Sequence, residues 1–178
     1  MLFRTLLLMT VLLLGLVAGP AAAENRDKPK WGEGGSWGIY VDINAGNVCY
    51  AVRGFPGGTA MLISVGSDGG LDFAIARDSW HFAEPGKGYR LKFVFGNDTT
   101  YEEVLKAVAL DTAVALSKAE MSAAFLSDFM EKTSLLVYYQ GSLIAAMVLS
   151  DTYDAVTQLR TCNASVAGLP DYSDPSLR

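Results

Sequence analysis

The chain has 178 residues and a formal net charge of −5, with 14 Lys and Arg against 19 Asp and Glu. An acidic chain without a long basic run is a poor candidate for binding nucleic acid or anionic lipid. One histidine and two cysteines supply too few nitrogen and sulfur ligands for a typical zinc site, and the sequence indicates no metal and no cofactor.

The N-terminus has the pattern of a secretory signal peptide. Arg4 supplies the positive charge, Leu6–Val17 is almost entirely apolar, and Ala21–Ala23 is a small-residue cleavage site. A membrane anchor is the alternative, but it requires a longer apolar run. We therefore expect a periplasmic or secreted protein with no stable membrane insertion after cleavage. The expected layout is a signal peptide over residues 1–23, a flexible lead-in over 24–35, one β-rich domain over 36–164 and a loose tail over 165–178.

Short β-strands separated by turns rich in Gly, Asn and Asp are predicted for most of the chain before residue 117. In Tyr89–Phe95, aromatic and apolar residues alternate with Arg90, Lys92 and Val94, which indicates a half-buried antiparallel strand. Thr99–Leu110 also has apolar residues at helical spacing, but we favour a strand because its neighbours form a meander. The other expected strands before residue 117 are Trp37–Ile43, Val48–Arg53, Thr59–Val65, Leu71–Ala76 and Thr112–Leu116.

Two helices and a hairpin are expected in the last third of the chain. Ser117–Glu120 fits a capping box, and apolar residues at helical spacing follow it up to Met130. Ser150–Thr152 offers side-chain oxygens for the N-cap of a second helix, which places Cys162 on the side facing the core. Between the helices, Leu135–Tyr139 and Leu143–Leu149 flank a turn in which Gly141 can adopt positive φ. Both strands are mostly apolar, which favours central strands covered on both faces.

These elements predict an α+β fold that is mainly β: an antiparallel β-sandwich or barrel-like sheet with two short helices packed on it. The chain has an even number of cysteines, Cys49 and Cys162, and is expected to be exported. Both facts favour a disulfide between an early strand and the last helix. The chain-entropy model puts the contribution of such a long-loop bridge at about 4 kcal/mol. Two free thiols with a catalytic role are the alternative, which the absence of a C-x-x-C motif disfavours.

The sequence identifies no catalytic residue. His81, the only histidine, lies between Trp80 and Phe82, which favours a packed or surface histidine over a general base. Glu102 and Glu103 are adjacent and point apart in a strand or a helix, so they do not form a glycosidase pair with each other. Two N-glycosylation acceptor triplets begin at Asn97 and Asn163; they matter only in a eukaryotic source.

The order of elements near the C-terminus resembles that of the invasion-associated locus B family of small periplasmic proteins. The residues that carry this resemblance are Phe125–Lys132, Leu135–Leu149 and Ala155–Leu159. Members of that family typically have more cysteines and a Gly-aromatic pair before the last helix, where this chain has Asp151–Tyr153. The resemblance implies an exported, non-enzymatic, β-rich protein linked to the envelope or to host interaction, and it supplies no catalytic residues.

We expect a non-catalytic binding protein that contacts another protein or an envelope component, such as an inhibitor, an immunity-like factor or a host-interaction factor. Its contact surface is expected on the loops Gly54–Gly58, Gly66–Gly70 and Asp78–Gly88, since loops on a rigid sheet commonly carry function. The candidate partner-binding residues in these loops are Phe55, Pro56, Asp68, Trp80, His81 and Phe82. The alternative is a small secreted hydrolase that uses a pair of carboxylates.

Overall fold

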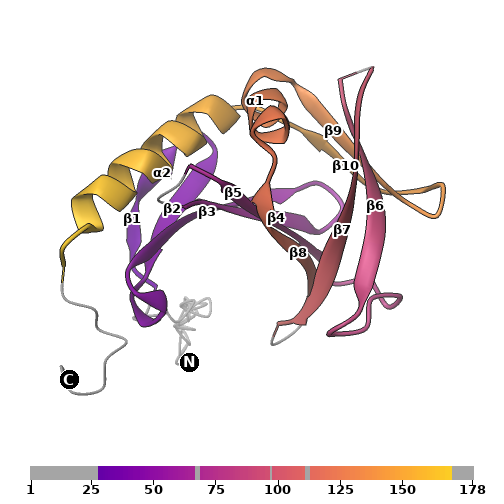
Figure 1. Cartoon of the computed structure of the whole chain (residues 1–178), viewed down its shortest axis with the longest axis horizontal. Helices are drawn as coiled ribbons and strands as arrows, with labels where there is room; N and C mark the ends of the chain where they lie inside the picture. Colours follow the sequence, from indigo (N-terminus) through magenta and orange to yellow (C-terminus); the bar gives the residue numbers. More distant parts are fainter. Residues whose placement is uncertain (1–27, 67–68, 97, 111–112, 170–178) are drawn as a thin grey trace, which may run out of the picture.

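The computed structural model describes residues 28–66, 69–96, 98–110 and 113–169, and this part of the chain forms one ten-stranded sheet with two α-helices (Figure 1). The strands are β1 (Lys30–Gly34), β2 (Trp37–Asp42), β3 (Val48–Phe55), β4 (Thr59–Val65), β5 (Leu71–Arg77), β6 (Gly88–Phe95), β7 (Thr99–Ala109), β8 (Val114–Met121), β9 (Ser134–Tyr139) and β10 (Ser142–Val148). The helices are the 3-10 helix η1 (Ile43–Ala45), α1 (Ala123–Glu131) and α2 (Thr152–Val166). The expected signal peptide and residues 170–178 of the expected tail lie outside the described residues.

The sheet has the order β1-β2-β3-β4-β5-β8-β7-β6-β9-β10, and its neighbouring strands are antiparallel. The first five strands form a meander. After β5 the chain crosses over, so that β8 pairs with β5, and β6 comes to lie beside the β9–β10 hairpin. This crossover brings β6 and β9 together, although almost forty residues separate them in the sequence.

Helix α1 fills the concave side of the sheet. The ring of Phe125 lies 5.7 Å from that of Phe73 in β5 and 5.4 Å from that of Phe93 in β6. Phe129 lies 5.9 Å from Trp37 of β2. This one short helix therefore contacts β2 as well as β5 and β6, and the sheet curls around it (Figure 1). The predicted class, α+β and mainly β with two helices packed on an antiparallel sheet, is confirmed.

Helix α2 covers β1 to β4 and is tied to β3 by the disulfide between Cys49 and Cys162, as predicted. Next to the disulfide, the side chain of Asn163 donates a hydrogen bond to the Val65 carbonyl at 2.7 Å and accepts one from the Cys49 N–H at 3.4 Å. The side chain of this glycosylation triplet is therefore engaged in the fold. The helix extends to Val166, two residues past the boundary expected for the domain.

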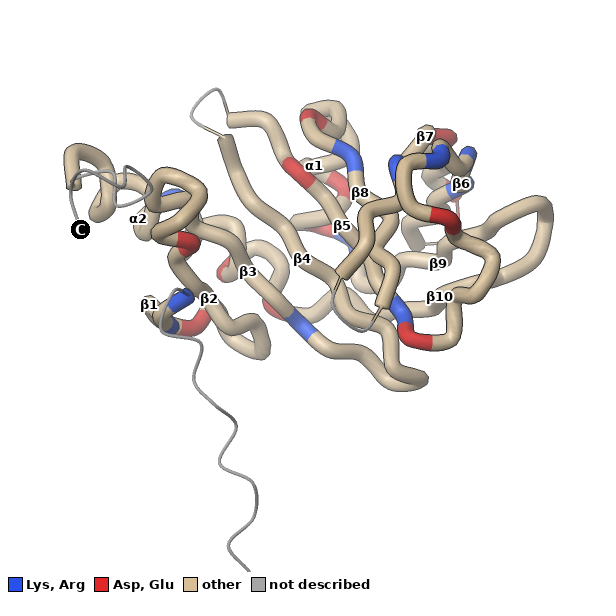
Figure 2. Tube along the Cα trace, turned by 90° about the horizontal axis from the view of Figure 1, so that it is seen from below, with Lys and Arg blue, Asp and Glu red and all other residues tan. Residues whose placement is uncertain are grey.

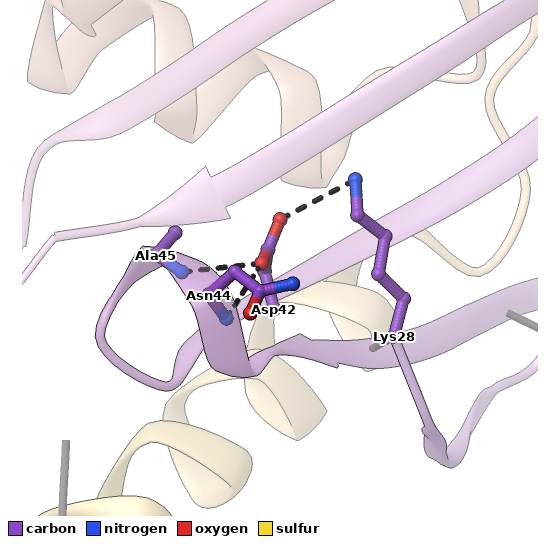
Figure 3. Close-up of polar contacts among 4 residues, drawn as sticks. All are labelled: Lys28, Asp42, Asn44 and Ala45. Atoms are coloured by element: carbon purple, nitrogen blue, oxygen red, sulfur yellow. Dashed lines mark hydrogen bonds and ion pairs between the residues drawn. The ribbon is translucent and has the colours of Figure 1, made fainter. Parts of the chain in front are cut away.

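The expectation of a flexible lead-in is wrong for residues 30–34, which form β1 at one edge of the sheet. The polar, Gly-rich sequence carries no strand signal here, because β1 is stabilised by pairing with β2 and by packing against α2. Just before it, Lys28 forms an ion pair with Asp42 at 3.3 Å, and Asp42 also accepts the N–H groups of Asn44 and Ala45 at the start of η1 (Figure 3).

The predicted capping box is wrong, because Ser117–Glu120 belongs to β8. Ser117 lies opposite Ala74 of β5 and Lys106 of β7, so it is paired on both sides, and Lys118 lies opposite Phe73 of β5. This pairing outweighs the contribution of a local cap, which is about 1 kcal/mol. The helix begins later: the hydroxyl of Ser122 accepts the N–H of Phe125 at 3.1 Å.

The second predicted N-cap is also wrong in its chemistry. Asp151 has a φ of 60°, and its side chain caps no N–H of its own helix. Its carboxylate instead accepts the backbone N–H of Ser36 at 3.0 Å and the Ser36 hydroxyl at 2.8 Å. These two hydrogen bonds lower the pKa of Asp151 and join the start of α2 to the β1–β2 turn.

The hairpin after α1 forms as predicted, but β10 is an edge strand and not a central one. Leu143 and Val148 are 52% and 67% exposed, so one face of β10 is open to solvent. The apolar sequence of β10 wrongly predicted a central strand, because hydrogen bonds from side chains, which a sequence pattern does not show, stabilise this edge. Arg77 donates to the Ile144 carbonyl at 3.2 Å, and Arg53 donates to the Ser150 carbonyl, just after β10, at 2.7 Å.

Candidate functional site

The first loop expected to bind a partner has its aromatic residue in the core. Phe55 is 7% exposed, and its ring lies 6.1 Å from that of Trp37. The Arg53 guanidinium lies 4.9 Å from the centre of the Phe55 ring. Pro56 is exposed, so it is the accessible member of this loop. Asp68, in the second loop, lies outside the described residues.

In the third loop, Trp80 and Phe82 belong to an aromatic cluster. Trp80 is 6% exposed, and Phe82 stacks on Tyr139 of β9 with ring centres 4.9 Å apart. The Tyr89 hydroxyl accepts the Glu84 N–H at 2.7 Å and donates to the Phe82 carbonyl at 3.1 Å. This loop is therefore packed onto β6 and β9. His81 is exposed and lies beside a shallow groove with Asp78.

A groove of about 760 Å³ lies beside this cluster, between β6 and the tip of the β9–β10 hairpin. The pairing of β6 with β9 ends at Leu91 and Tyr139, and the hairpin tip continues past that point. Gly88 and Gly141 also line the groove and have no side chains to fill it. The polar and aromatic residues that line the groove are Tyr89, Arg90, Lys92, Glu102, Tyr138, Tyr139 and Gln140.

The groove carries positive charge on an acidic protein. Arg90 and Lys92 lie two residues apart on β6, and so on the same face, and Lys106 lies opposite Gly88 on β7. The four ion pairs among the described residues include none of these three cations. Lys92 and Glu102 face each other across the two strands without forming an ion pair. Along β6 and β7, basic residues lie together with acidic ones (Figure 2).

The inner face of the same strands has a different, partly buried polar network. Lys118 of β8 pairs with Glu103 of β7, and the Tyr101 hydroxyl donates to Asp128 of α1. Burial, and then the hydrogen bond to Asp128, raise the pKa of Tyr101 to about 12. The Tyr101–Asp128 hydrogen bond joins α1 to the sheet, and the Lys118–Glu103 ion pair joins β8 to β7.

The grooves give no support to a hydrolase that uses paired carboxylates. Of the four clearest grooves on the described part of the chain, three are lined by one carboxylate residue and one by none. The described residues also hold no group of three or more His, Cys, Asp and Glu side chains that could bind a metal ion.

Arg90, Lys92 and Tyr138 were not among the binding residues predicted from the sequence. The alternation in Tyr89–Phe95 places Arg90 and Lys92 on the exposed face, and that signal was available. The contribution of Tyr138 could not be predicted from the sequence, because it depends on the crossover that places β9 beside β6.

Comparison with known proteins gives a structural likeness and no sequence-level match. No family model and no curated protein matches the chain significantly. A crystal structure of invasion associated protein B from Bartonella henselae is similar, with a TM-score of 0.55 and 11% sequence identity. The match covers 77% of this chain and 98% of that one, so nearly all of that protein is represented. At this identity the likeness concerns the fold. Within the described residues, every helix is too short or too polar to span a bilayer.

Proposed function

We propose that the chain is an exported, non-catalytic binding protein of the cell envelope, periplasmic or secreted, which contacts another protein or an envelope component through the β6–β9 groove. The observation that carries this proposal is the groove itself: Arg90 and Lys92, free of ion pairs, line a hollow of about 760 Å³ beside Tyr138. Arg and Tyr, with Trp, are enriched among the residues that dominate the binding energy at interfaces.

We further propose that the chain is a distant member of the invasion-associated locus B family. The element order predicted to resemble that family, and the likeness to invasion associated protein B, support this relationship. Export is supported by the signal-peptide pattern and by the disulfide, since disulfides persist mainly in oxidising compartments. Pro56 and His81 remain proposed secondary contacts because they are exposed in loops near the sheet ends.

Photocrosslinking in the source cell tests this function. A photoreactive phenylalanine analogue is placed at Tyr138 in the groove, at Pro56 or His81 in the loops, or at Tyr153 on the exposed side of α2 as the control. We expect a processed, exported chain that forms a discrete adduct from Tyr138 and none from Tyr153. An unprocessed chain retained in the cytoplasm, or no adduct from the groove, contradicts the proposal.

A further inference from the structure

The cations in the groove are spaced like the side chains of an extended peptide. Arg90 and Lys92 are at positions i and i+2 of β6, so their Cα atoms lie about 6.6 Å apart on one face. In any extended strand, every second side chain points to the same side with this repeat. Two carboxylates at alternate positions of a partner strand therefore match the two cations in register.

The rest of the groove lining restricts where the acids can bind. Lys92 lies between Glu102 of β7 and Tyr138 of β9, and all three side chains are on one face of the sheet. Glu102 repels a carboxylate on its own side of Lys92, so the acid that pairs with Lys92 lies on the side of Tyr138, whose ring offers an apolar contact for its methylene groups. Lys106, across from Gly88, extends the positive surface past the end of the groove.

Building on the proposed function, we propose that the groove binds an extended acidic segment of a partner protein, with acidic residues at alternate positions. The carboxylates pair with Arg90 and Lys92 beside the Tyr138 ring, and the intervening side chains point away from the sheet. The charge of the two cations is complementary to this segment, and the groove runs along β6 from Gly88 to Val94, which is the length of a short strand.

Fluorescence anisotropy on the disulfide-bonded mature protein tests this at low salt. One labelled peptide has Glu and Ala alternating over six residues; its isomer, Glu-Glu-Ala-Ala-Glu-Ala, has the same composition but no two Glu at alternate positions. We expect the alternating peptide to bind about fivefold more tightly than its isomer, and the double change Arg90→Gln with Lys92→Gln to weaken it at least about tenfold. The matched control, Lys132→Gln with Arg160→Gln, removes two cations elsewhere and should change affinity less than about twofold.

Three results overturn the inference: equal binding of the two isomers, binding that the Arg90 and Lys92 changes do not weaken, or equal binding of an anionic polysaccharide such as polygalacturonate. The last result assigns the groove to a glycan. If these peptides fail while the Tyr138 adduct still forms in cells, the acidic-segment inference fails and the proposed function stands. If the Tyr138 adduct is also absent, the proposed function fails with it.

Discussion

Gly34 lies where strand β1 meets helix α2, and the backbones of the two elements approach so closely that no side chain fits at this position. A Cβ added at Gly34 would lie 2.7 Å from the Cα of Ala155, which is backbone and cannot turn aside. Gly32, on the same strand, has nothing within 4 Å of an added Cβ. The two glycines therefore provide a matched pair that separates close packing from strand propensity.

We expect Gly34→Ala to lower the free energy of unfolding by about 1–3 kcal/mol, the usual cost of overpacking. Gly32→Ala should change it by less than about 0.5 kcal/mol. Urea unfolding of the two variants measures this difference, and equal stabilities would show that β1 does not pack on α2 as described.

Tyr101 links the sheet to α1 through its hydrogen bond to Asp128. Burial and this hydrogen bond raise the pKa of Tyr101 from its ordinary value of 10.0 to about 12. The proton is therefore held more tightly in the folded chain than in the unfolded one. The stability from this group is complete below pH 10 and is lost as the pH rises towards 12.

The change Tyr101→Phe should make stability less dependent on pH in this alkaline window, because it removes the titrating group. At neutral pH the variant should lose about 1 kcal/mol, the net contribution of a typical hydrogen bond. Denaturant unfolding at several values between pH 10 and 12 measures the slope. Identical slopes for wild type and variant would mean that Tyr101 ionises like an exposed tyrosine.

At the scale of elements, the strands that alternate or lie between clear turns were predictable. Thr59–Val65 has its predicted bounds, and Thr99–Ala109 is the strand favoured over a helix. Errors arose where tertiary contacts override a local signal. Ser117 and Glu120 fit a helix cap by spacing, but Ser117 is paired in the sheet, and Glu120 lies in an irregularity of the β5–β8 pairing with a φ of 57°. The groove was not predictable, because its two walls meet only after the crossover between β5 and β6.

Edge strand β10 depends on Arg77, whose guanidinium donates to the Ile144 carbonyl. We expect Arg77→Met to speed amide hydrogen exchange in β10 by about tenfold, since a hydrogen bond to a charged donor contributes about 1.5–3 kcal/mol. Exchange in β6 should not change. Arg160→Met, on the exposed side of α2, is the control. Unchanged exchange in β10 would show that the arginine does not hold this edge.

At the scale of the whole molecule, one disulfide ties the early part of the sheet to the last helix across a sequence separation of 113 residues. Closing so long a loop restricts the unfolded chain, and the chain-entropy model assigns this about 4–5 kcal/mol. The disulfide also holds α2 over β1 to β4, where it covers the core.

The double change Cys49→Ala with Cys162→Ala should lower the free energy of unfolding by about 4 kcal/mol without abolishing the fold. Thermal and urea unfolding measure the loss. The β6–β9 groove lies at the opposite end of the strand order from β1 to β4, which α2 covers. The folded variant should therefore keep its affinity for the alternating peptide. A folded variant that has lost this affinity would contradict the separation of the two regions.

Mapping the bound peptide on the isotope-labelled protein by NMR tests the central claim most directly. On addition of the alternating Glu-Ala peptide, we predict amide shift changes concentrated at residues 88–92 of β6, at Glu102 and at residues 138–141 of the hairpin tip. Shift changes centred on the 54–58 loop or on α2, or none at all, would contradict the account.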